Sequence, residues 1–218
     1  MRILALEGAF ESFTIALMDD DQLLASASLG PKRALEDGLG EIAHCLAQAS
    51  ETGAGLDRLA VGVGPGAFTG LRIAIAYAKA LALGWGIPLV GISSFDLLES
   101  HSELPRVLSI VSGRKGVISA RYRDLDCEAR ASGAIDDVLS AVLASSNAQA
   151  PLPVLGASKD VLSALAEREI VVSVITPRFT HAATAVAYLA LQKMPEASAH
   201  ALRADYGEAP AAKLPSIR

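Results

Sequence analysis

Apolar and polar positions follow two different periods along the first fifty residues. Short apolar runs at 2–7, 12–18 and 23–25 are separated by a glycine-containing turn and by an acidic turn, which predicts a three-stranded antiparallel meander. Over residues 34–50 apolar positions recur every three or four residues, which predicts an amphipathic helix. The apolar stripe of this helix consists of Leu35, Leu39, Ile42 and Leu46.

The next segment changes to longer apolar runs. Residues 59–63 and 88–92 are continuously apolar, as is typical of strands that are buried on both faces of a parallel sheet. A helix is predicted between them over residues 71–83, because glycines follow it. A Ser-Ser pair can then cap a short helix that runs to residue 99. This alternation of strands and helices predicts an α/β fold.

The pattern begins again after residue 103. Residues 106–110 align with residues 2–6, and residues 117–120 align with residues 13–16, at one constant offset. A constant offset favours a duplicated unit over chance similarity. The second copy continues with predicted helices at 136–144, 158–167 and 181–193 and with predicted strands at 153–155 and 170–174.

The expected fold class is therefore a duplicated α/β fold with two lobes, of which the second is smaller. We expect an N-terminal lobe over residues 1–103 and a C-terminal lobe over residues 104–206, with the helix at 181–193 able to pack back on the first lobe. Residues 207–218 contain two prolines and are expected to form a loose tail. This layout resembles the actin, sugar-kinase and Hsp70 ATPase class, which is ribonuclease H-like. In that class phosphate binds in the cleft between the lobes.

Composition and charge narrow the range of functions. The 218 residues are 51% hydrophobic and 20% charged, which excludes a disordered chain, and the formal net charge of -5 disfavours nucleic-acid binding by the chain alone. The longest apolar region, residues 73–92, contains a lysine, two glycines and a proline, so no membrane span is expected. Cys45 and Cys127 form no C-x-x-C motif, as suits a reducing compartment. We expect a soluble cytoplasmic protein.

The most specific string lies at the junction of the strand at 59–63 with the following helix. It consists of Gly64, Pro65, Gly66, Ala67, Phe68, Thr69 and Gly70. Either it is a tight turn that lets the helix pack close to the sheet, or its amides bind an anion at the helix N-terminus. The string lacks the G-K-[ST] of a P-loop, and Pro65 removes an amide that a G-x-G-x-x-G loop would use. The packing interpretation is therefore favoured.

This string, extended to residue 73, resembles the G-P-G-S-F-T-G-[LV]-R-I-G signature of the TsaB (YeaZ) family, with Ala67 in place of serine. Residues 78–82 and 86–94 resemble the family's continuation, so the chain is identified as a divergent member. The resemblance implies a non-catalytic actin-like subunit that partners the paralogous transferase TsaD and the ATPase TsaE. Together these proteins place threonylcarbamoyl on the adenosine beside the tRNA anticodon. The resemblance also implies that the chain forms a homodimer when it is alone, and that it contacts tRNA only through the complex.

Three strings depart from the family pattern. Residues 6–10 read Leu-Glu-Gly-Ala-Phe where the family has I-D-T-S-T, residues 33–36 lack the histidine of R-H-S-E, and residues 112–114 read Ser-Gly-Arg instead of D-A-R. A lobe-closing ATPase needs carboxylates to hold hydrated Mg²⁺. We therefore expect no ATP hydrolysis by the chain alone, assign no catalytic residue and no nucleotide site, and leave ATP or ADP open only at the interface of the complex.

Other candidate chemistry is poorly supported. The histidines, His44, His101, His181 and His200, have no H-E-x-x-H or H-x-x-x-H spacing, so no metal site is expected. This counts against a peptidase, although the wider family resembles proteins labelled M22 glycopeptidases. The pairs Ser93-Ser94 and Ser145-Ser146 lack a G-x-S-x-G elbow, and Cys45 lies within the amphipathic helix as a packing residue.

A partner surface is the remaining candidate site. In the helix at 71–83, Lys79 is the one charge after Arg72, so the helix is either covered by the fold or exposed as an apolar face. Ala74, Ala78 and Ala82 would allow close approach of another helix. The candidate interface consists of Leu35, Leu39, Ile42, Leu46, Leu71, Arg72, Ile75 and Lys79. The family resemblance implies that this face serves both homodimers and the TsaD heterodimer.

Two classes of function stay open. One is a non-catalytic scaffold of the tRNA threonylcarbamoylation machinery. The other is an enzyme, either a sugar-kinase-like ATPase or an M22-type glycopeptidase. The missing aspartates and metal ligands favour the scaffold.

Overall fold

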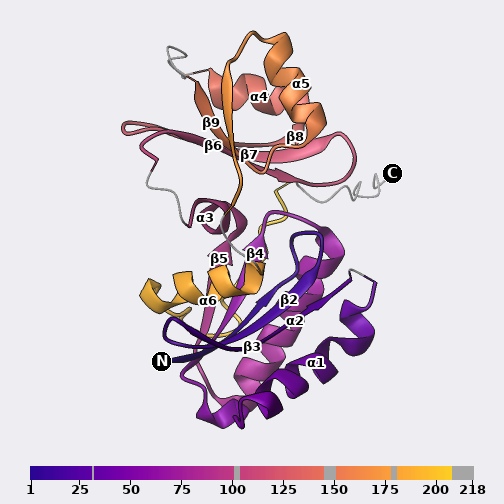
Figure 1. Cartoon of the computed structure of the whole chain (residues 1–218), viewed down its shortest axis with the longest axis vertical. Coiled ribbons are helices and arrows are strands. Elements are labelled where there is room, and N and C mark those ends of the chain that lie inside the picture. The colour runs from indigo at the N-terminus through magenta and orange to yellow at the C-terminus, as the bar shows by residue number, and fades with distance from the viewer. Residues whose placement is uncertain (31, 101–103, 145–150, 178–180, 208–218) are drawn as a thin grey trace, which may run out of the picture.

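The computed structural model describes residues 1–30, 32–100, 104–144, 151–177 and 181–207. Two lobes follow one another along the long axis of the molecule, and each contains one five-stranded sheet (Figure 1). Among the described residues, no helix combines the length and the apolar character needed to cross a membrane.

The first lobe is a mixed sheet with helices on both faces. Its strands lie in the order β3-β2-β1-β4-β5, with antiparallel pairing among the first three and parallel pairing from β1 to β4 and β5. The strands are β1 (Arg2–Glu7), β2 (Phe13–Asp19), β3 (Gln22–Leu29), β4 (Arg58–Gly64) and β5 (Leu89–Ser93). The helices are α1 (Ala34–Gln48), a 3₁₀ turn η1 (Gly53–Gly55), α2 (Phe68–Trp85) and α3 (Ser94–Glu99). The main core lies between this sheet and the α1–α2 layer.

The second lobe repeats this topology. Its sheet has the order β10-β9-β6-β7-β8. Strands β6, β7 and β8 again form an antiparallel meander, and β9 and β10 again add to it in parallel. The strands are β6 (Val107–Ser112), β7 (Val117–Arg123), β8 (Glu128–Ala134), β9 (Leu152–Leu155) and β10 (Val172–Ile175). Helices α4 (Ile135–Leu143) and α5 (Lys159–Glu167) cover one face. The predicted duplicated α/β fold with two lobes is confirmed.

The last helix, α6 (Ala182–Gln192), packs on the first lobe although it follows the second sheet in the chain (Figure 1). It carries no charged side chain, and its alanines pack with β1, β2 and β4 in a second apolar cluster. A helix that is apolar all round is stable when it is covered on several sides. The Oγ1 atom of Thr14 in β2 accepts a hydrogen bond from the N–H of Ala183 at 3.1 Å, which fixes the start of α6.

Domain boundaries stay a prediction. Glu103, at the expected boundary, and residues 208–218 of the expected tail lie outside the described residues. Residues 194–207, for which the sequence predicted no element, run back along the first lobe. Leu202 lies in its core, and the N–H of Asp205 donates to the carbonyl of Val63 at 2.7 Å. This segment brings Tyr206 beside the start of α2.

A buried ion-pair network joins the two lobes. Arg121 of β7 is 4% exposed, and it pairs with Glu99 at 3.0 Å and with Asp96 at 2.8 Å, both in α3. The second carboxylate oxygen of Glu99 accepts from Arg123 at 3.1 Å, and Ser109 of β6 donates to the first at 2.5 Å. Because breaking a buried ion pair leaves an uncompensated charge, this network holds α3 against the second sheet.

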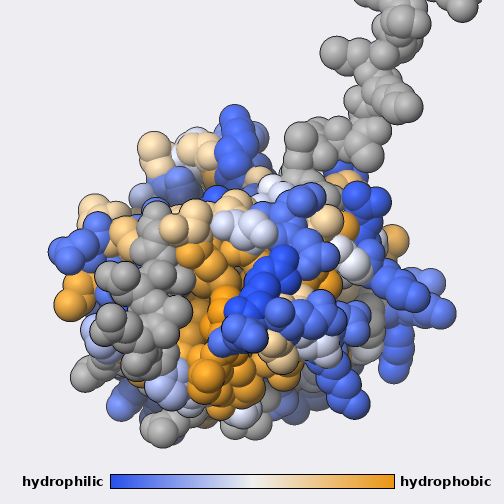
Figure 2. Space-filling view, turned by 90° about the horizontal axis from the view of Figure 1, so that it is seen from above, coloured by the Kyte–Doolittle hydropathy of each residue, from blue (hydrophilic) through white to orange (hydrophobic). Residues whose placement is uncertain are grey.

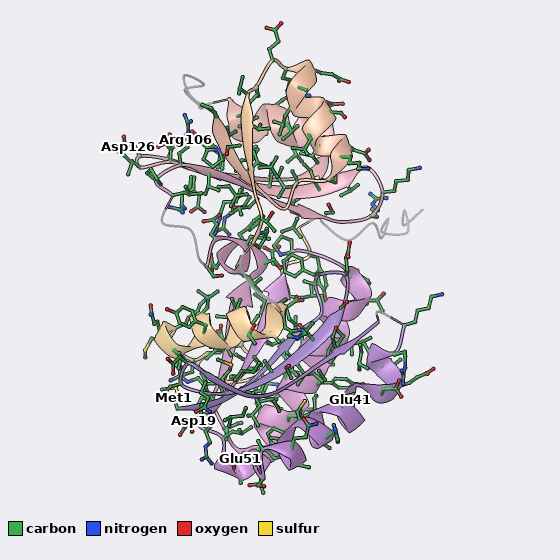
Figure 3. All side chains as sticks on the ribbon, in the orientation of Figure 1. Met1, Asp19, Glu41, Glu51, Arg106 and Asp126 are labelled. Carbon is green, nitrogen blue, oxygen red and sulfur yellow. The ribbon has the colours of Figure 1, made fainter. Side chains whose placement is uncertain are left out.

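Charged and apolar side chains also gather at the two ends of the molecule. At the end of the first lobe, around the labelled Met1, Asp19 and Glu51 in Figure 3, the N-terminal ammonium pairs with Asp19 and Arg2 pairs with Glu51. The end of the second lobe shows an apolar area beside hydrophilic side chains (Figure 2). Strand β10 forms an edge of this lobe's sheet and exposes Val174, and Val171, which directly precedes the strand, is also exposed. Among the described residues, these two valines are exposed apolar side chains at this edge of the sheet.

Candidate functional site

The glycine-rich string lies in close contact with the turn between β1 and β2. A Cβ atom on Gly66 would lie 2.3 Å from the carbonyl oxygen of Ala9, and one on Gly70 would lie 2.1 Å from that of Gly8. Gly64 has a φ of +95°, and a Cβ there would meet the carbonyl of Asp205 at 2.2 Å. These approaches leave no room for a side chain at any of the three positions, and the left-handed φ of Gly64 also favours glycine.

The remaining members of the string start α2. The helix begins at Phe68 rather than at residue 71, so Phe68 and Thr69 lie in its first turn and are exposed, whereas Pro65 is buried. The N–H of Ala67, which precedes the helix, donates to the carbonyl of Ala9 at 2.7 Å. One amide that an anion would need is therefore already used by the neighbouring turn.

Substituting Gly70 by valine is expected to lower the free energy of unfolding by about 2 kcal/mol, because the new Cβ meets backbone rather than a flexible side chain. Gly84 in the same helix is the matched control. Nothing lies within 4 Å of a Cβ built there, so Gly84→Ala should be neutral or slightly stabilising. Urea unfolding of both variants measures the difference. A Gly70→Val chain as stable as the wild type would show that the contact is not structural.

Glu7 is a functional candidate that the sequence interpretation missed. It ends β1 and is 0% exposed, and the N–H of Ala9 donates to its Oε1 atom at 2.5 Å. Its Oε2 atom has no hydrogen-bond partner among the described residues. Burial raises the pKa of Glu7 to about 7, against the opposing effect of backbone N–H groups of Ala9, Phe10 and Gly8. An acid directly after the apolar run of residues 3–6 was the signal for it.

This carboxylate changes how the β1–β2 turn can act. The sequence interpretation treated residues 6–10 as having lost an acid, but the chain keeps a carboxylate there on a side chain one methylene longer. The Glu7 carboxyl group lies against the turn's amides and accepts the hydrogen bond of the N–H of Ala9. This donor is therefore already used within the chain, whether Glu7 is charged or neutral.

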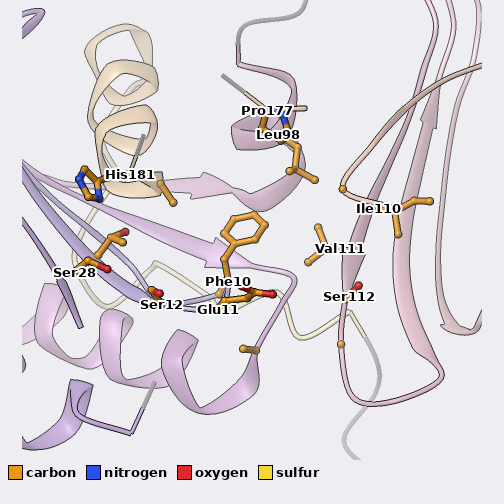
Figure 4. Close-up of a pocket in the computed structure, with 16 residues that line it drawn as sticks. Phe10, Glu11, Ser12, Ser28, Leu98, Ile110, Val111, Ser112, Pro177 and His181 are labelled. Carbon is orange, nitrogen blue, oxygen red and sulfur yellow. The ribbon is translucent and has the colours of Figure 1, made fainter. Parts of the chain in front are cut away.

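The cleft between the lobes has a volume of about 820 Å³. Phe10 and Glu11 enter it from the β1–β2 turn, Ser112 lies across from them on β6, and His181 lies at the start of α6 (Figure 4). Among the 16 described lining residues, Glu11 and His181 are the ionisable ones. Phe10 packs against apolar clusters of both lobes. These residues do not fit a Mg²⁺-nucleotide, which needs paired carboxylates for the ion and several donors for the phosphates.

The candidate partner interface is divided by the structure. Leu35 and Leu39 of α1 are 67% and 51% exposed, Arg72 is exposed and Lys79 is half-buried. Four of the eight candidate interface residues lie in the core of the same lobe and do not face a partner: Ile42, Leu46, Leu71 and Ile75.

The cause of this division is the small residue Gly38. A Cβ there would lie 2.7 Å from the ring of Tyr77, so α1 sits close to α2 on that side and Leu35 and Leu39 fall at the edge of the buried stripe. The alanines expected to line a helix contact, Ala74, Ala78 and Ala82, are also buried. The small residues that α2 exposes are instead Ala76, Ala80 and Gly84.

These positions define one surface, which we call the outer helical face. It consists of Leu35, Leu39, Arg72, Ala76, Ala80 and Leu83. The two helices that carry it lie side by side on the sheet (Figure 1), and the hydroxyl of Tyr77 in α2 donates to the carbonyl of Leu35 in α1 at 2.8 Å. The six residues are apolar apart from Arg72, with the half-buried Lys79 on the same side of α2, and the small α2 side chains allow another helix to approach closely.

The other sequence candidates do not come together. His44 lies on α1, His181 lines the cleft and His200 lies in the C-terminal segment, whereas His101 and the Ser145-Ser146 pair lie outside the described residues. Within the described part of the chain, no group of three or more histidine, cysteine, aspartate or glutamate side chains could hold a metal ion. Cys45 is buried in the core, and its desolvation raises the pKa of its thiol.

Comparison with known proteins agrees with the fold. TsaB of Escherichia coli strain K12 is 33% identical over 122 residues, which cover 54% of this chain and 53% of TsaB. A tRNA N6-adenosine threonylcarbamoyltransferase of Geobacter sp. strain M21 is 30% identical over 136 residues, which cover 52% of this chain and 40% of that protein. The chain thus spans about half the length, or less, of these curated relatives.

A solved structure matches over almost the whole chain. The protein with similarity to the peptidase YeaZ from Pseudomonas aeruginosa has a TM-score of 0.70 at 20% identity, and the match covers 95% of this chain and 99% of that one. A family model described as TsaD, tRNA N6-adenosine threonylcarbamoyltransferase, matches residues 33–198. The chain therefore belongs to the family of this TsaD model and, within it, to the TsaB/YeaZ group.

Proposed function

We propose that the chain is a non-catalytic subunit in tRNA threonylcarbamoyladenosine biosynthesis, and that it binds and activates a TsaD-like paralogue. The observation that carries this proposal is the cleft: the fold is that of nucleotide-binding proteins, but the described lining offers one carboxylate, Glu11. At the neighbouring turn, the N–H of Ala9 is already used by the Glu7 carboxyl group, which leaves one donor fewer for a phosphate. The described lining thus favours a function through binding over ATP hydrolysis.

The outer helical face supports a binding role. Its exposed leucines and alanines form apolar surface on two adjacent helices, which is the kind of surface that protein partners cover. If the paralogue binds this face in only one of its conformations, binding shifts the paralogue's population toward that conformation. The size of the shift is set by the difference in affinity between the conformations. Activation therefore requires no chemistry from the chain itself.

The TsaD-like partner of the proposed assembly follows from the names of the relatives. The TsaE-like ATPase, as a further member of the complex, rests on the family resemblance of the sequence motif alone. The net charge of -5 favours contact with tRNA through the complex rather than by this chain alone. In the absence of the paralogue, two copies of the chain cover their outer helical faces against each other. ATP or ADP binds at the interface of the complex and not to the isolated chain.

Thermal shift measurements test the proposal. We expect no change in the melting temperature of the isolated chain with Mg-ATP, and a rise when the TsaD-like paralogue is added. A ligand at 100 times its dissociation constant stabilises a protein by about 2.7 kcal/mol, so a nucleotide site of ordinary affinity would be detected. Stabilisation by Mg-ATP alone would support a sugar-kinase-like ATPase instead.

A further inference from the structure

An exposed arginine near the start of α2 lies against a pair of aromatic rings that also contact each other. The guanidinium carbon of Arg72 lies 3.8 Å from the ring centre of Phe68 and 5.3 Å from that of Tyr206. The Nε atom of Arg72 donates to the Tyr206 hydroxyl at 3.3 Å. Phe68 and Tyr206 are 52% and 39% exposed, so the cluster faces solvent. The stacking orders a side chain that would otherwise be mobile.

Arg72 has no carboxylate partner among the described residues, unlike Arg121, Arg123 and Arg130, each of which pairs with an aspartate or a glutamate. Its Nε atom is engaged and its plane is stacked, so the two terminal Nη groups are the free donors. A planar guanidinium presents these donors as a fork that matches a carboxylate or a phosphate. Because the rings already hold the side chain, binding an anion costs less rotamer entropy.

We propose that Arg72, held by Phe68 and Tyr206, binds a carboxylate of the TsaD-like partner at one end of the outer helical face. This inference rests on the proposed function. A protein carboxylate is favoured over a nucleic-acid phosphate because the chain carries a net charge of -5 and the rest of this face is apolar. Arginine, tyrosine and phenylalanine are also enriched in the centres of protein interfaces. The C-terminal segment contributes to the site through Tyr206.

The test compares the affinity of Arg72 variants for the paralogue. Arg72→Gln is expected to weaken binding at least about 30-fold, because the partner's carboxylate is left unpaired. Arg72→Lys keeps the positive charge but not the two forked donors, so its affinity for the paralogue should fall less than that of Arg72→Gln. Arg130→Gln is the matched control: Arg130 also lies over an aromatic ring, that of Phe95 at 5.6 Å, but it is already paired with Glu128 and lies in the second lobe. It should leave the affinity unchanged.

A charge swap identifies the partner group. Arg72→Glu should abolish binding, and one variant in a panel of single Asp→Arg and Glu→Arg changes in the paralogue should restore it. If Arg72→Gln binds the paralogue with wild-type affinity, or if it loses tRNA binding while paralogue binding is unchanged, the proposed carboxylate contact is wrong. The proposed function is not affected by either result. If the wild-type chain does not bind the paralogue, the proposed function and this inference both fail. Far-UV melting curves establish that each variant is folded.

Discussion

Replacing Leu39 by glutamate is expected to abolish binding of the TsaD-like paralogue while the chain stays folded. Leu39 is 51% exposed on α1, so in the isolated chain the new carboxylate remains in water. In a complex that covers the outer helical face, the same carboxylate would be buried without a partner. An unpaired buried charge costs several kcal/mol, so the affinity should fall at least about 100-fold. Isothermal titration and far-UV melting measure the two effects separately.

The control for Leu39 lies on the same helix. Ile42 is buried in the core of the first lobe, so Ile42→Glu should unfold the chain rather than affect binding selectively. Leu39→Ala is a milder change at the interface position that introduces no charge. A folded Leu39→Glu chain that binds the paralogue with wild-type affinity would remove α1 from the partner surface.

Replacing Glu7 by glutamine is expected to stabilise the chain above neutral pH. The amide keeps the oxygen that accepts from the N–H of Ala9 and removes a charge that is fully buried. Burial raises the pKa of Glu7 from 4.5 to about 7 in the folded state. A shift of this size corresponds to about 3 kcal/mol between the two protonation states. At pH 8, the free energy of unfolding of Glu7→Gln should exceed that of the wild type by nearly this value.

The pH dependence follows from the direction of the shift. Between pH 4.5 and about 7 the folded chain holds more protons at Glu7 than the unfolded chain does. The free energy of unfolding therefore falls as the pH rises from 4.5 to about 7, and the contribution of protonated Glu7 is fully present only below pH 4.5. The difference between Glu7→Gln and the wild type should therefore be small at pH 4.5 and large at pH 8. Glu11→Gln removes an exposed carboxylate from the same turn and should change stability little at either pH. Equal differences at both values would contradict a buried titrating carboxylate.

The elements of the fold could be predicted because their local signals agree with the tertiary structure. The apolar runs that became β4 and β5 are buried on both faces, and the repeated meander appears as two sheets of the same strand order. The ends of the helices and strands were harder to predict from the sequence. Strand β3 runs over Gln22–Leu29, well past the predicted 23–25, because its alternate residues are polar and lie on a partly exposed strand at the edge of the sheet.

The candidate site could be predicted only in part, because burial depends on neighbours that are distant in sequence. Periodicity placed Leu39 and Ile42 on one stripe, but the close contact of Gly38 with Tyr77 decides which of them is covered. In α2 apolar residues lie on all sides, so the sequence did not distinguish the buried Ala78 from the exposed Ala80. The cluster around Arg72 depends on a segment more than a hundred residues away, for which no periodic signal exists.

In the proposed function, this chain activates a paralogous transferase without catalysing a reaction itself. The most direct measurement is threonylcarbamoyladenosine formation on tRNA by the TsaD-like paralogue and the TsaE-like ATPase, with and without this chain. We predict that activity requires the wild-type chain and is not restored by folded Leu39→Glu. Full activity without the chain, or with Leu39→Glu in its place at the same concentration, would contradict the claim.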